Sequence, residues 1–541
     1  MTSATYRTTP LDGIRGLKQN WQSDIVSGFI IFLIALPLSL GIAIASGMPP
    51  MAGIIAAVIG GVVVSQCSGS FVTINGPAAG LIVVLVTAID KLGGGMQGYH
   101  ATLAAIVISG VILFILGLLK AGELGKAFPA SVVHGMLASI GMIIMLKQFP
   151  VMMGVAPPAK EPLMLLQKIP YTIAHANPEL AFIGTLSLLL LIVVSTVKHS
   201  IFRKVPAPLM VVALACSLGM FFNVTVAHSY SAFGQTFDIS PARCLVQVPS
   251  NIASAFTAPD FSAIYKNGFW MAVMSITLVQ GIETILSCAS VDKLDPFRRH
   301  ANLSKDLSAV GLGSAISGML GGLPMIAEIV RSTANISNGG KTRWSNFFHG
   351  MFILVFILFA SKFINSIPLS ALAALLVFTG YRLASPKVFM EIKALGWEQL
   401  FLFVTTIIVT LSSDLLIGAA AGIAIKCVLH TIRGVSVKQF FKGDVQIEDG
   451  ESDLVIVRIK KVAVFSNYLS IKKQLEKIPA SKKLVLDVSQ ATFIDHTVME
   501  HLHELEQNKN HEFAAVSFVG LDQLKATSNL PTAARKHIVV H

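Results

Sequence analysis

Arg331 and Glu283 are charged side chains that stand inside apolar runs, where a charge needs a chemical reason. An arginine at membrane depth costs at least about 2.5–3.5 kcal/mol, so it should face water or an anionic partner. Its planar guanidinium suits an oxyanion. We therefore predict that Arg331 contacts an anionic substrate, with a structural ion pair to Glu328, one helical turn earlier, as the alternative.

Glu283 lies in the run Gln280-Gly-Ile-Glu-Thr-Ile-Leu-Ser287 and is the most deeply placed acid of the chain. A carboxylate opposite an anion site could carry a coupling proton, ligate sodium together with Ser287 one turn later, or hold Arg331 in place. Purely structural pairing is the alternative. We predict that Glu283 and Ser287 form the coupling-ion or proton site, with sodium as the candidate metal ion.

Two short segments interrupted by Gly and Pro are expected to surround these charges. They run over 68–80 and 321–335, and each has an irregular start followed by a short helix. The N-terminus of a half-helix carries unpaired N–H groups and about half a positive charge, so two of them facing one cavity form an anion site. A packing kink is the alternative for either segment alone. The predicted substrate-binding residues of these segments are Gly76, Pro77, Ala78, Ala79, Ile326, Ala327, Glu328 and Arg331.

The composition is that of a membrane protein. Of the 541 residues, 53% are hydrophobic and 13% are charged, and the mean hydropathy is +0.71. Soluble domains contain about 25% charged residues, so an ordinary globular enzyme and a disordered chain are both excluded. The formal charge of +12 belongs to residues 1–440, where it lies in short loops between apolar runs. This placement indicates membrane orientation and not nucleic-acid binding.

Apolar runs long enough to cross a membrane, or pairs of shorter ones, recur about fourteen times. With a cytoplasmic N-terminus, seventeen Lys and Arg fall in inside loops and seven in outside loops. This asymmetry predicts a multi-pass protein of the cytoplasmic membrane with both termini in the cytoplasm. The Gly/Pro interruptions fall in the third segment of each seven, as in inverted-repeat transporters. The predicted spans are 24–46, 50–66, 71–89, 100–119, 128–147, 178–196, 206–222, 267–289, 305–321, 324–338, 345–361, 364–383, 398–413 and 414–432.

From about residue 440 the charges balance, and strand-like runs occur at 454–459, 483–488 and 513–519. We predict a cytoplasmic leader over 1–23, a transmembrane transport domain over 24–435 and a small cytoplasmic α/β domain over 440–541. No phosphate loop, Cys/His metal spacing or nucleophile motif occurs, which argues against ATP-driven transport and enzymatic activity and predicts no cofactor. His134 and Lys426 are lone polar residues in apolar runs, and we expect core or interfacial placement for both.

Several motifs, in order along nearly the whole chain, resemble the sulfate permease (SulP) family, solute carrier family 26. The tail resembles a STAS domain, in which Leu484-Val-Leu-Asp-Val-Ser489 is followed by Phe493-Ile-Asp-His-Thr497. His496 and Thr497 follow Asp495 where related domains have a phosphorylatable serine, so no phosphoswitch is expected. The motifs of the membrane part are Asp24-Ile-Val-Ser-Gly-Phe-Ile, Ala35-Leu-Pro-Leu-Ser-Leu-Gly-Ile-Ala43, Gly69-Ser-Phe-Val-Thr-Ile-Asn-Gly-Pro77, Glu283-Thr-Ile-Leu-Ser, Val291-Asp-Lys-Leu-Asp-Pro296, Ile329-Val-Arg-Ser-Thr-Ala-Asn335 and Gly340-Lys-Thr-Arg343.

The resemblance implies a seven-plus-seven inverted repeat with core and gate domains, an elevator-like movement, a homodimer and an anion site between the third and tenth spans. By this resemblance Arg331 matches an arginine that lies near the anion in many animal members. Ala78 and Ile42 stand at positions that are often aromatic, which implies a wider or differently shaped pocket. Glu283 and Ser287 match an acid and a hydroxyl that ligate sodium in the bicarbonate-transporting cyanobacterial branch, although that branch lacks the arginine.

These features predict a secondary active transporter of small inorganic anions, sulfate or bicarbonate, coupled to protons or sodium. The expected partners are the anion, membrane lipid, a second copy of the chain and cytosolic regulators of the STAS domain. The alternatives are a symporter of dicarboxylates or nucleobases on the same fold, an uncoupled anion channel and a membrane-tethered signalling scaffold.

Overall fold

The computed structural model describes residues 9–123, 128–159, 161–197, 205–249, 255–413, 415–450, 453–506 and 513–537. The first eight residues of the predicted leader and the last four of the predicted tail domain lie outside the described residues. Contacts between residues divide the chain into two compact units. The first unit comprises Met1–Gly122 and Ile140–Arg382, and the second comprises Glu123–Ser139 and Leu383–His541.

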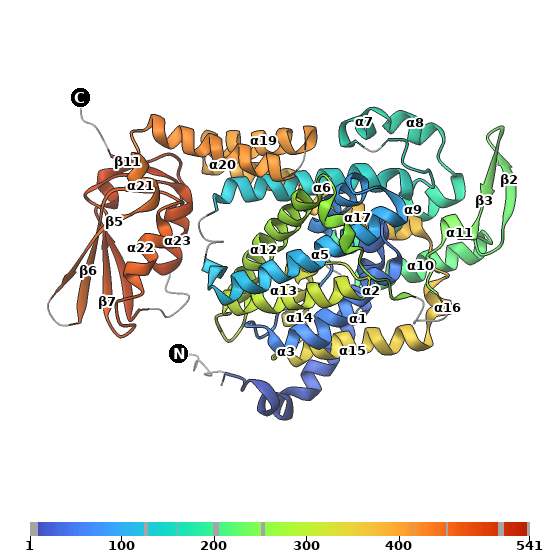
Figure 1. Cartoon of the computed structure of the whole chain (residues 1–541), viewed down its shortest axis with the longest axis horizontal. Coiled ribbons are helices and arrows are strands. Elements are labelled where there is room, and N and C mark those ends of the chain that lie inside the picture. The colour runs from blue at the N-terminus through green and yellow to red at the C-terminus, as the bar shows by residue number, and fades with distance from the viewer. Residues whose placement is uncertain are drawn as a thin grey trace. The chain divides into compact units, whose positions relative to one another are not determined.

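The first unit is a bundle of apolar helices around a core of Leu, Ile, Val and Ala side chains (Figure 1). Its two shortest strands interrupt helical segments, and a hairpin forms the other sheet. The elements are α1 (Gly13–Ala45), α2 (Pro50–Ile59), η1 (Gly60–Val64), α3 (Ser65–Cys67), β1 (Asn75–Gly76), η2 (Ala79–Leu81), α4 (Ile82–Lys91), α5 (Gly95–Leu118), the second part of α6 (Ala130–Met152), α7 (Pro162–Gln167), α8 (Ile169–Ala174), α9 (Pro178–Thr196), α10 (Ala207–Phe221), β2 (His228–Ala232), β3 (Gln235–Ile239), α11 (Pro241–Cys244), η5 (Phe261–Tyr265), α12 (Phe269–Leu294), α13 (Leu303–Met319), β4 (Ile326–Ala327), α14 (Ile329–Ser337), α15 (Trp344–Phe359), α16 (Ser361–Ile364) and α17 (Leu369–Leu383).

Each of the fourteen predicted spans overlaps a helix. In the described part of the chain, eight helices are long and apolar enough to cross a membrane, and three shorter ones are apolar. The predicted spans at 71–89 and 324–338 become the short helices α4 and α14, each preceded by irregular backbone. The multi-pass helical fold with two interrupted helices therefore agrees with the expectation from the sequence.

Helix α1 begins earlier than the apolar run that predicted it. The Asp12 side chain caps the helix by accepting a hydrogen bond from the Gly13 amide at 2.7 Å, so the helix begins eleven residues before residue 24. An aspartate at this position satisfies an amide that has no partner inside the helix. The polar residues of the predicted leader thus extend the first helix.

The second unit contains the first part of α6, the helices α18 (Pro386–Leu395), α19 (Trp397–Ser412), α20 (Leu415–Ile432) and α21 (Val437–Phe441), and a mixed sheet. The sheet order is β10-β11-β8-β6-β7-β9, and β5 pairs with β6. Alternate residues of β6 are buried, and they pack with apolar residues of α22 and α23 to form the core of this domain. Its elements are β5 (Asp444–Asp449), β6 (Leu454–Ala463), α22 (Tyr468–Leu475), β7 (Lys483–Asp487), β8 (Ala491–Ile494), α23 (His496–Glu506), β9 (Ala515–Val519), η6 (Leu521–Gln523), β10 (Leu524–Ala526) and β11 (Arg535–His537).

Candidate functional site

The two interrupted segments meet through their strands. Strand β1 pairs antiparallel with β4, with Asn75 opposite Ala327 and Gly76 opposite Ile326. The Glu328 amide extends the pairing by donating to the Ile74 carbonyl at 2.9 Å. Backbone polar groups at membrane depth need protein partners, and each strand satisfies the other. Segments about 250 residues apart in the sequence thus form one irregular backbone unit.

The first half-helix starts where the sequence predicts. Ala78 has extended backbone angles and caps the short 3-10 turn η2, which begins at Ala79 and continues into α4. The predicted donors Ala78 and Ala79 therefore lie at the start of the helical segment. Helix α1, which carries the buried Ile42, packs against both α4 and α14.

The second half-helix starts later than predicted. Helix α14 begins at Ile329, so Ile326 and Ala327 lie in β4 and are not amides of the first helical turn. The expectation that these two residues form the helix N-terminus is wrong, because pairing with β1 keeps the backbone extended through Glu328. The positive end of this half-helix therefore lies around Glu328 to Arg331.

Arg331 reaches from the second interrupted segment to the first. Its side chain is 1% exposed, and Nη2 donates to the Pro77 carbonyl at 3.2 Å. Within the described residues, Nε and Nη1 have no hydrogen-bond partner, and no carboxylate forms an ion pair with Arg331 within 4.0 Å. The predicted alternative, an ion pair with Glu328, is not formed as a close contact, although the Glu328 carboxylate attracts Arg331 at longer range. A buried cation in the first turn of a helix adds to the positive end of the helix dipole.

Glycine makes the close approach of Arg331 to the first segment possible. A Cβ at Gly76 would lie 2.6 Å from Nη1 of Arg331, which is closer than a carbon atom and a nitrogen atom can pack. The backbone of β1 can therefore pass directly beside the guanidinium only because residue 76 has no side chain.

Glu283 lies against the first half-helix. A Cβ at Gly80 would collide with the Glu283 carboxyl group, so the carboxylate packs directly on the turn η2. Glu283 is 9% exposed, and its Oε1 has no hydrogen-bond partner among the described residues. Ser287 is buried one turn later on the same helix α12. Arg331 and Glu283 thus both contact the short stretch from Gly76 to Gly80.

A network that the sequence reading did not assign supports these two segments. Ser332 Oγ accepts a hydrogen bond from the Ile74 amide at 2.9 Å, and Asn335 Nδ2 donates to the Val72 carbonyl at 2.8 Å. Both side chains are buried on α14. The sequence signal that could have identified them is the cluster of polar side chains on the short helix α14, next to irregular backbone that needs hydrogen-bond partners.

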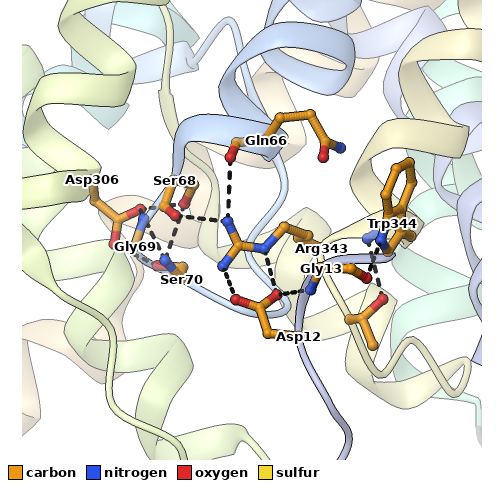
Figure 2. Close-up of polar contacts among 10 residues, drawn as sticks. Asp12, Gly13, Gln66, Ser68, Gly69, Ser70, Asp306, Arg343 and Trp344 are labelled. Carbon is orange, nitrogen blue, oxygen red and sulfur yellow. Dashed lines mark hydrogen bonds and ion pairs between the residues drawn. The ribbon is translucent and has the colours of Figure 1, made fainter. Parts of the chain in front are cut away.

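Figure 2 shows a second part of this network, at the start of the first interrupted segment. Asp306 accepts hydrogen bonds from the amides of Gly69 and Ser70 at 3.0 and 3.2 Å and from the hydroxyls of Ser68 and Ser70. Arg343 forms a two-pronged pair with Asp12 at 2.7 and 2.8 Å and donates to the Ser68 carbonyl at 2.9 Å. The residue before α1, helix α13 and the residue before α15 therefore all contribute to holding the loop that leads into β1.

Comparison with known proteins relates this chain to a family of transporters. The family model described as "Sulfate permease family" matches residues 21–406. A putative sulfate transporter of Bacillus subtilis, YvdB, is 25% identical over 77% of this chain and 74% of its own length. The bicarbonate transporter BicA of Synechocystis is 24% identical over 93% of this chain and 88% of its own. These relatives are transporters and not enzymes.

Solved structures agree with the fold. The transmembrane domain of a cyanobacterial bicarbonate transporter BicA has 25% identity and a TM-score of 0.63, covering 74% of this chain and 97% of that one. The murine Solute Carrier 26 family member A9 anion transporter, in its inward-facing state, has 14% identity and a TM-score of 0.64, covering 92% of this chain and 85% of that one. With a family model that matches most of the chain, and a helical membrane fold with two interrupted helices, the chain belongs to the sulfate permease family.

Proposed function

We propose that this protein is a secondary active transporter of small inorganic anions, with sulfate and bicarbonate as the candidate substrates. The names of its relatives support both anions, since YvdB is a putative sulfate transporter and BicA a bicarbonate transporter. The proposed anion site comprises Arg331, the start of α14 with Glu328, the paired residues Ile326 and Ala327, the turn from Gly76 to Ala79, and Ile42 on the helix behind them.

The buried guanidinium of Arg331 is the observation that carries this proposal. Two of its three nitrogens have no hydrogen-bond partner among the described residues, and the carboxylate of Glu328 attracts it only from beyond 4.0 Å. A buried, unpaired charge costs several kcal/mol, and a small oxyanion would supply both the charge and the hydrogen-bond acceptors that are missing. Bound there, the anion would lie between the two repeats.

Glu283 is proposed to carry the coupling. Its carboxylate contacts the same turn as the anion site but from another helix, and Oε1 is without a hydrogen-bond partner in the described structure. Protonation of Glu283, or binding of sodium by Glu283 and Ser287, would remove a negative charge close to the anion. Either event would favour anion binding through simple Coulomb attraction and repulsion.

The remaining parts of the proposal concern the whole protein. We propose elevator-like alternating access in a homodimer of the cytoplasmic membrane, with both termini cytoplasmic. The proposed domains are a leader over 1–23, a transport domain over 24–435 and a STAS domain over 440–541. The mixed sheet with α22 and α23 packed on its core supports the last assignment, and cytosolic regulators are its proposed partners.

Uptake into proteoliposomes tests the proposal. Radiolabelled sulfate and bicarbonate are offered to the reconstituted protein with a proton gradient, a sodium gradient or no gradient. We expect saturable uptake of one anion that a gradient accelerates. Uptake of a dicarboxylate or nucleobase alone would indicate the alternative symporter, and rapid flux that ignores both gradients would indicate a channel. No uptake of either anion under any gradient would contradict the substrate assignment.

A further inference from the structure

Helix α20 and the C-terminal domain share a buried cluster of charged side chains. Lys426 and His430 lie one turn apart on α20, and both are 0% exposed. Lys426 Nζ lies 3.4 Å and His430 Nε2 3.5 Å from Oδ2 of Asp495, which is 1% exposed and follows strand β8. All of these residues belong to the second compact unit. The lone lysine of an apolar run thus has its counter-charge in the domain that follows.

Asp495 is held in place by its own domain. Its two oxygens accept hydrogen bonds from the amides of Phe465 and Val498, both at 2.8 Å, and the second bond caps α23. Burial opposes ionisation of this carboxyl group, but Lys426 and His430 outweigh it and hold the pKa of Asp495 well below its usual value. The carboxylate is therefore positioned by amides of its own domain and is kept charged by Lys426 and His430.

The cluster also includes the neighbouring hydroxyl and an aromatic ring. Lys426 Nζ donates to Thr497 Oγ1 at 3.3 Å and lies 5.2 Å from the centre of the Phe465 ring. The Ala130 amide, at the start of α6, donates to the same hydroxyl at 3.4 Å. Two apolar helices thus contact the loop from Asp495 to Thr497 at once.

Neither Lys426 nor Asp495 would be stable as a buried charge without the other. An unpaired lysine in an apolar environment is costly, and removing one partner of a buried ion pair leaves the other charge uncompensated. We infer that the loop Asp495–Thr497 is a docking site for α20, and that this polar latch makes the C-terminal domain move with α20 and thereby controls the transport rate. The control of rate rests on the proposed function, whereas the docking does not.

The docking is tested by hydrogen–deuterium exchange of the full-length protein in nanodiscs, in wild type and in Lys426→Met. We expect the amides of Phe465 and Val498 to exchange at least about tenfold faster in the variant. Lys438→Met, which removes an exposed lysine of α21, is the matched control and should leave both amides unchanged. Unchanged protection in Lys426→Met would overturn the docking.

A variant that retains the charge distinguishes loss of the ion pair from a general folding defect. Lys426→Arg keeps the cation and should keep the two amides protected, whereas a purely steric role for the lysine would make Lys426→Arg as damaging as Lys426→Met. In addition, the double variant Lys426→Met/Asp495→Asn should lose less amide protection than the sum of the losses in the two single variants, because the two side chains interact directly. Additive effects would overturn the latch.

Uptake measurements test the control of rate. Lys426→Met should change the maximal rate of anion uptake while the half-saturating anion concentration stays within about twofold, since Lys426 does not line the proposed anion site. An unchanged maximal rate in a protein that has lost amide protection would overturn the control of rate. If the wild type itself transports no anion, the proposed function fails, and the exchange experiment still decides the docking.

Discussion

Arg331 is a buried cation that has no carboxylate within 4.0 Å among the described residues, although Glu328 attracts it at longer range. Among the described residues, the guanidinium donates a hydrogen bond to the Pro77 carbonyl and to no other group, and the neighbouring Gly76 leaves room for it. Glu283, on another helix, presents a carboxylate oxygen that is equally without a hydrogen-bond partner among the described residues. At the scale of single residues, the site thus contains one donor group and one acceptor group whose natural partners are an anion and a cation or proton.

Substitution of Arg331 should weaken anion binding, by an amount that depends on whether the charge is kept. A hydrogen bond to a charged group contributes about 1.5–3 kcal/mol, so Arg331→Gln should raise the half-saturating anion concentration roughly 10- to 100-fold. Arg331→Lys keeps the charge but loses the planar fork, so its half-saturating anion concentration should lie between those of wild type and Arg331→Gln. The measurement is concentration-dependent uptake into proteoliposomes. Arg298→Gln removes an exposed arginine and serves as the control. Full affinity in Arg331→Gln would remove the residue from the site.

Gly80→Ala should disturb coupling while leaving the fold intact. The new Cβ would displace the carboxyl group of Glu283, which is the flexible end of its side chain. We expect normal expression and thermal stability, with uptake that responds at least about tenfold less to the driving ion gradient. Comparison of gradient-driven and gradient-free uptake measures this effect. Wild-type acceleration by the gradient in Gly80→Ala would show that the position of the Glu283 carboxylate is unimportant.

At the scale of elements, two short helices and two two-residue strands must be held without long hydrogen-bond ladders. Asp306 of α13, Arg343 before α15, and Ser332 and Asn335 of α14 supply the missing partners. All four side chains bond to the backbone of residues 68–74. The geometry of the site therefore depends on side chains that never contact the proposed anion.

Loss of the Asp306 side chain should destabilise the protein more than loss of Asp12. Asp306→Ala leaves the buried Gly69 amide and the hydroxyls of Ser68 and Ser70 without this acceptor, whereas the Ser70 amide keeps Ser68 Oγ as a partner. Each unsatisfied group costs about 1–3 kcal/mol. Asp12 is 46% exposed and its partner Arg343, although buried, keeps the Ser68 carbonyl, so Asp12→Ala should cost about 1–2 kcal/mol, the sum of a helix cap and a half-exposed ion pair. Denaturant unfolding of the purified proteins in one detergent compares them. A larger loss in Asp12→Ala would contradict this ordering.

At the scale of the whole molecule, charge is distributed unevenly along the chain. The net charge of +12 lies in the first 440 residues, and the remaining residues are neutral overall. Inside the second compact unit, however, a few charges are fully buried, and Asp495 is the central one. We therefore expect the net positive charge to set the orientation in the membrane, whereas the buried charges of this unit link elements of the fold.

The stability conferred by Asp495 should be lost on acidification. Its pKa in the folded protein lies below the ordinary 3.8, chiefly because Lys426 and His430 outweigh the effect of burial. Above about pH 4 the full contribution is present, and as the pH falls further the unfolded chain takes up the proton first, so stability decreases. Calorimetry of wild type and Asp495→Asn between pH 7 and pH 3 isolates this group. The difference in stability between wild type and Asp495→Asn should shrink below about pH 4. A difference that stays constant over this range would contradict the assignment.

The orientation predicted from the loop charges can be tested in intact cells. In a chain whose native cysteines are replaced, Thr236→Cys in the exposed hairpin strand β3 should react with a membrane-impermeant maleimide. Gln523→Cys in the exposed turn η6 should react only after permeabilisation. The opposite pattern would reverse the predicted positive-inside orientation.

The sequence by itself determined the membrane class, the positions of the spans, the two interrupted helices and the buried charges Arg331 and Glu283, because hydrophobic runs, Gly/Pro breaks and lone charges are local properties. Only the tertiary structure decided which groups meet. Arg331 bonds to Pro77 across 254 positions, α14 starts late because β4 pairs with β1, and Lys426 on α20 pairs with Asp495 after strand β8. Such contacts depend on the packing of whole helices, which no local pattern encodes.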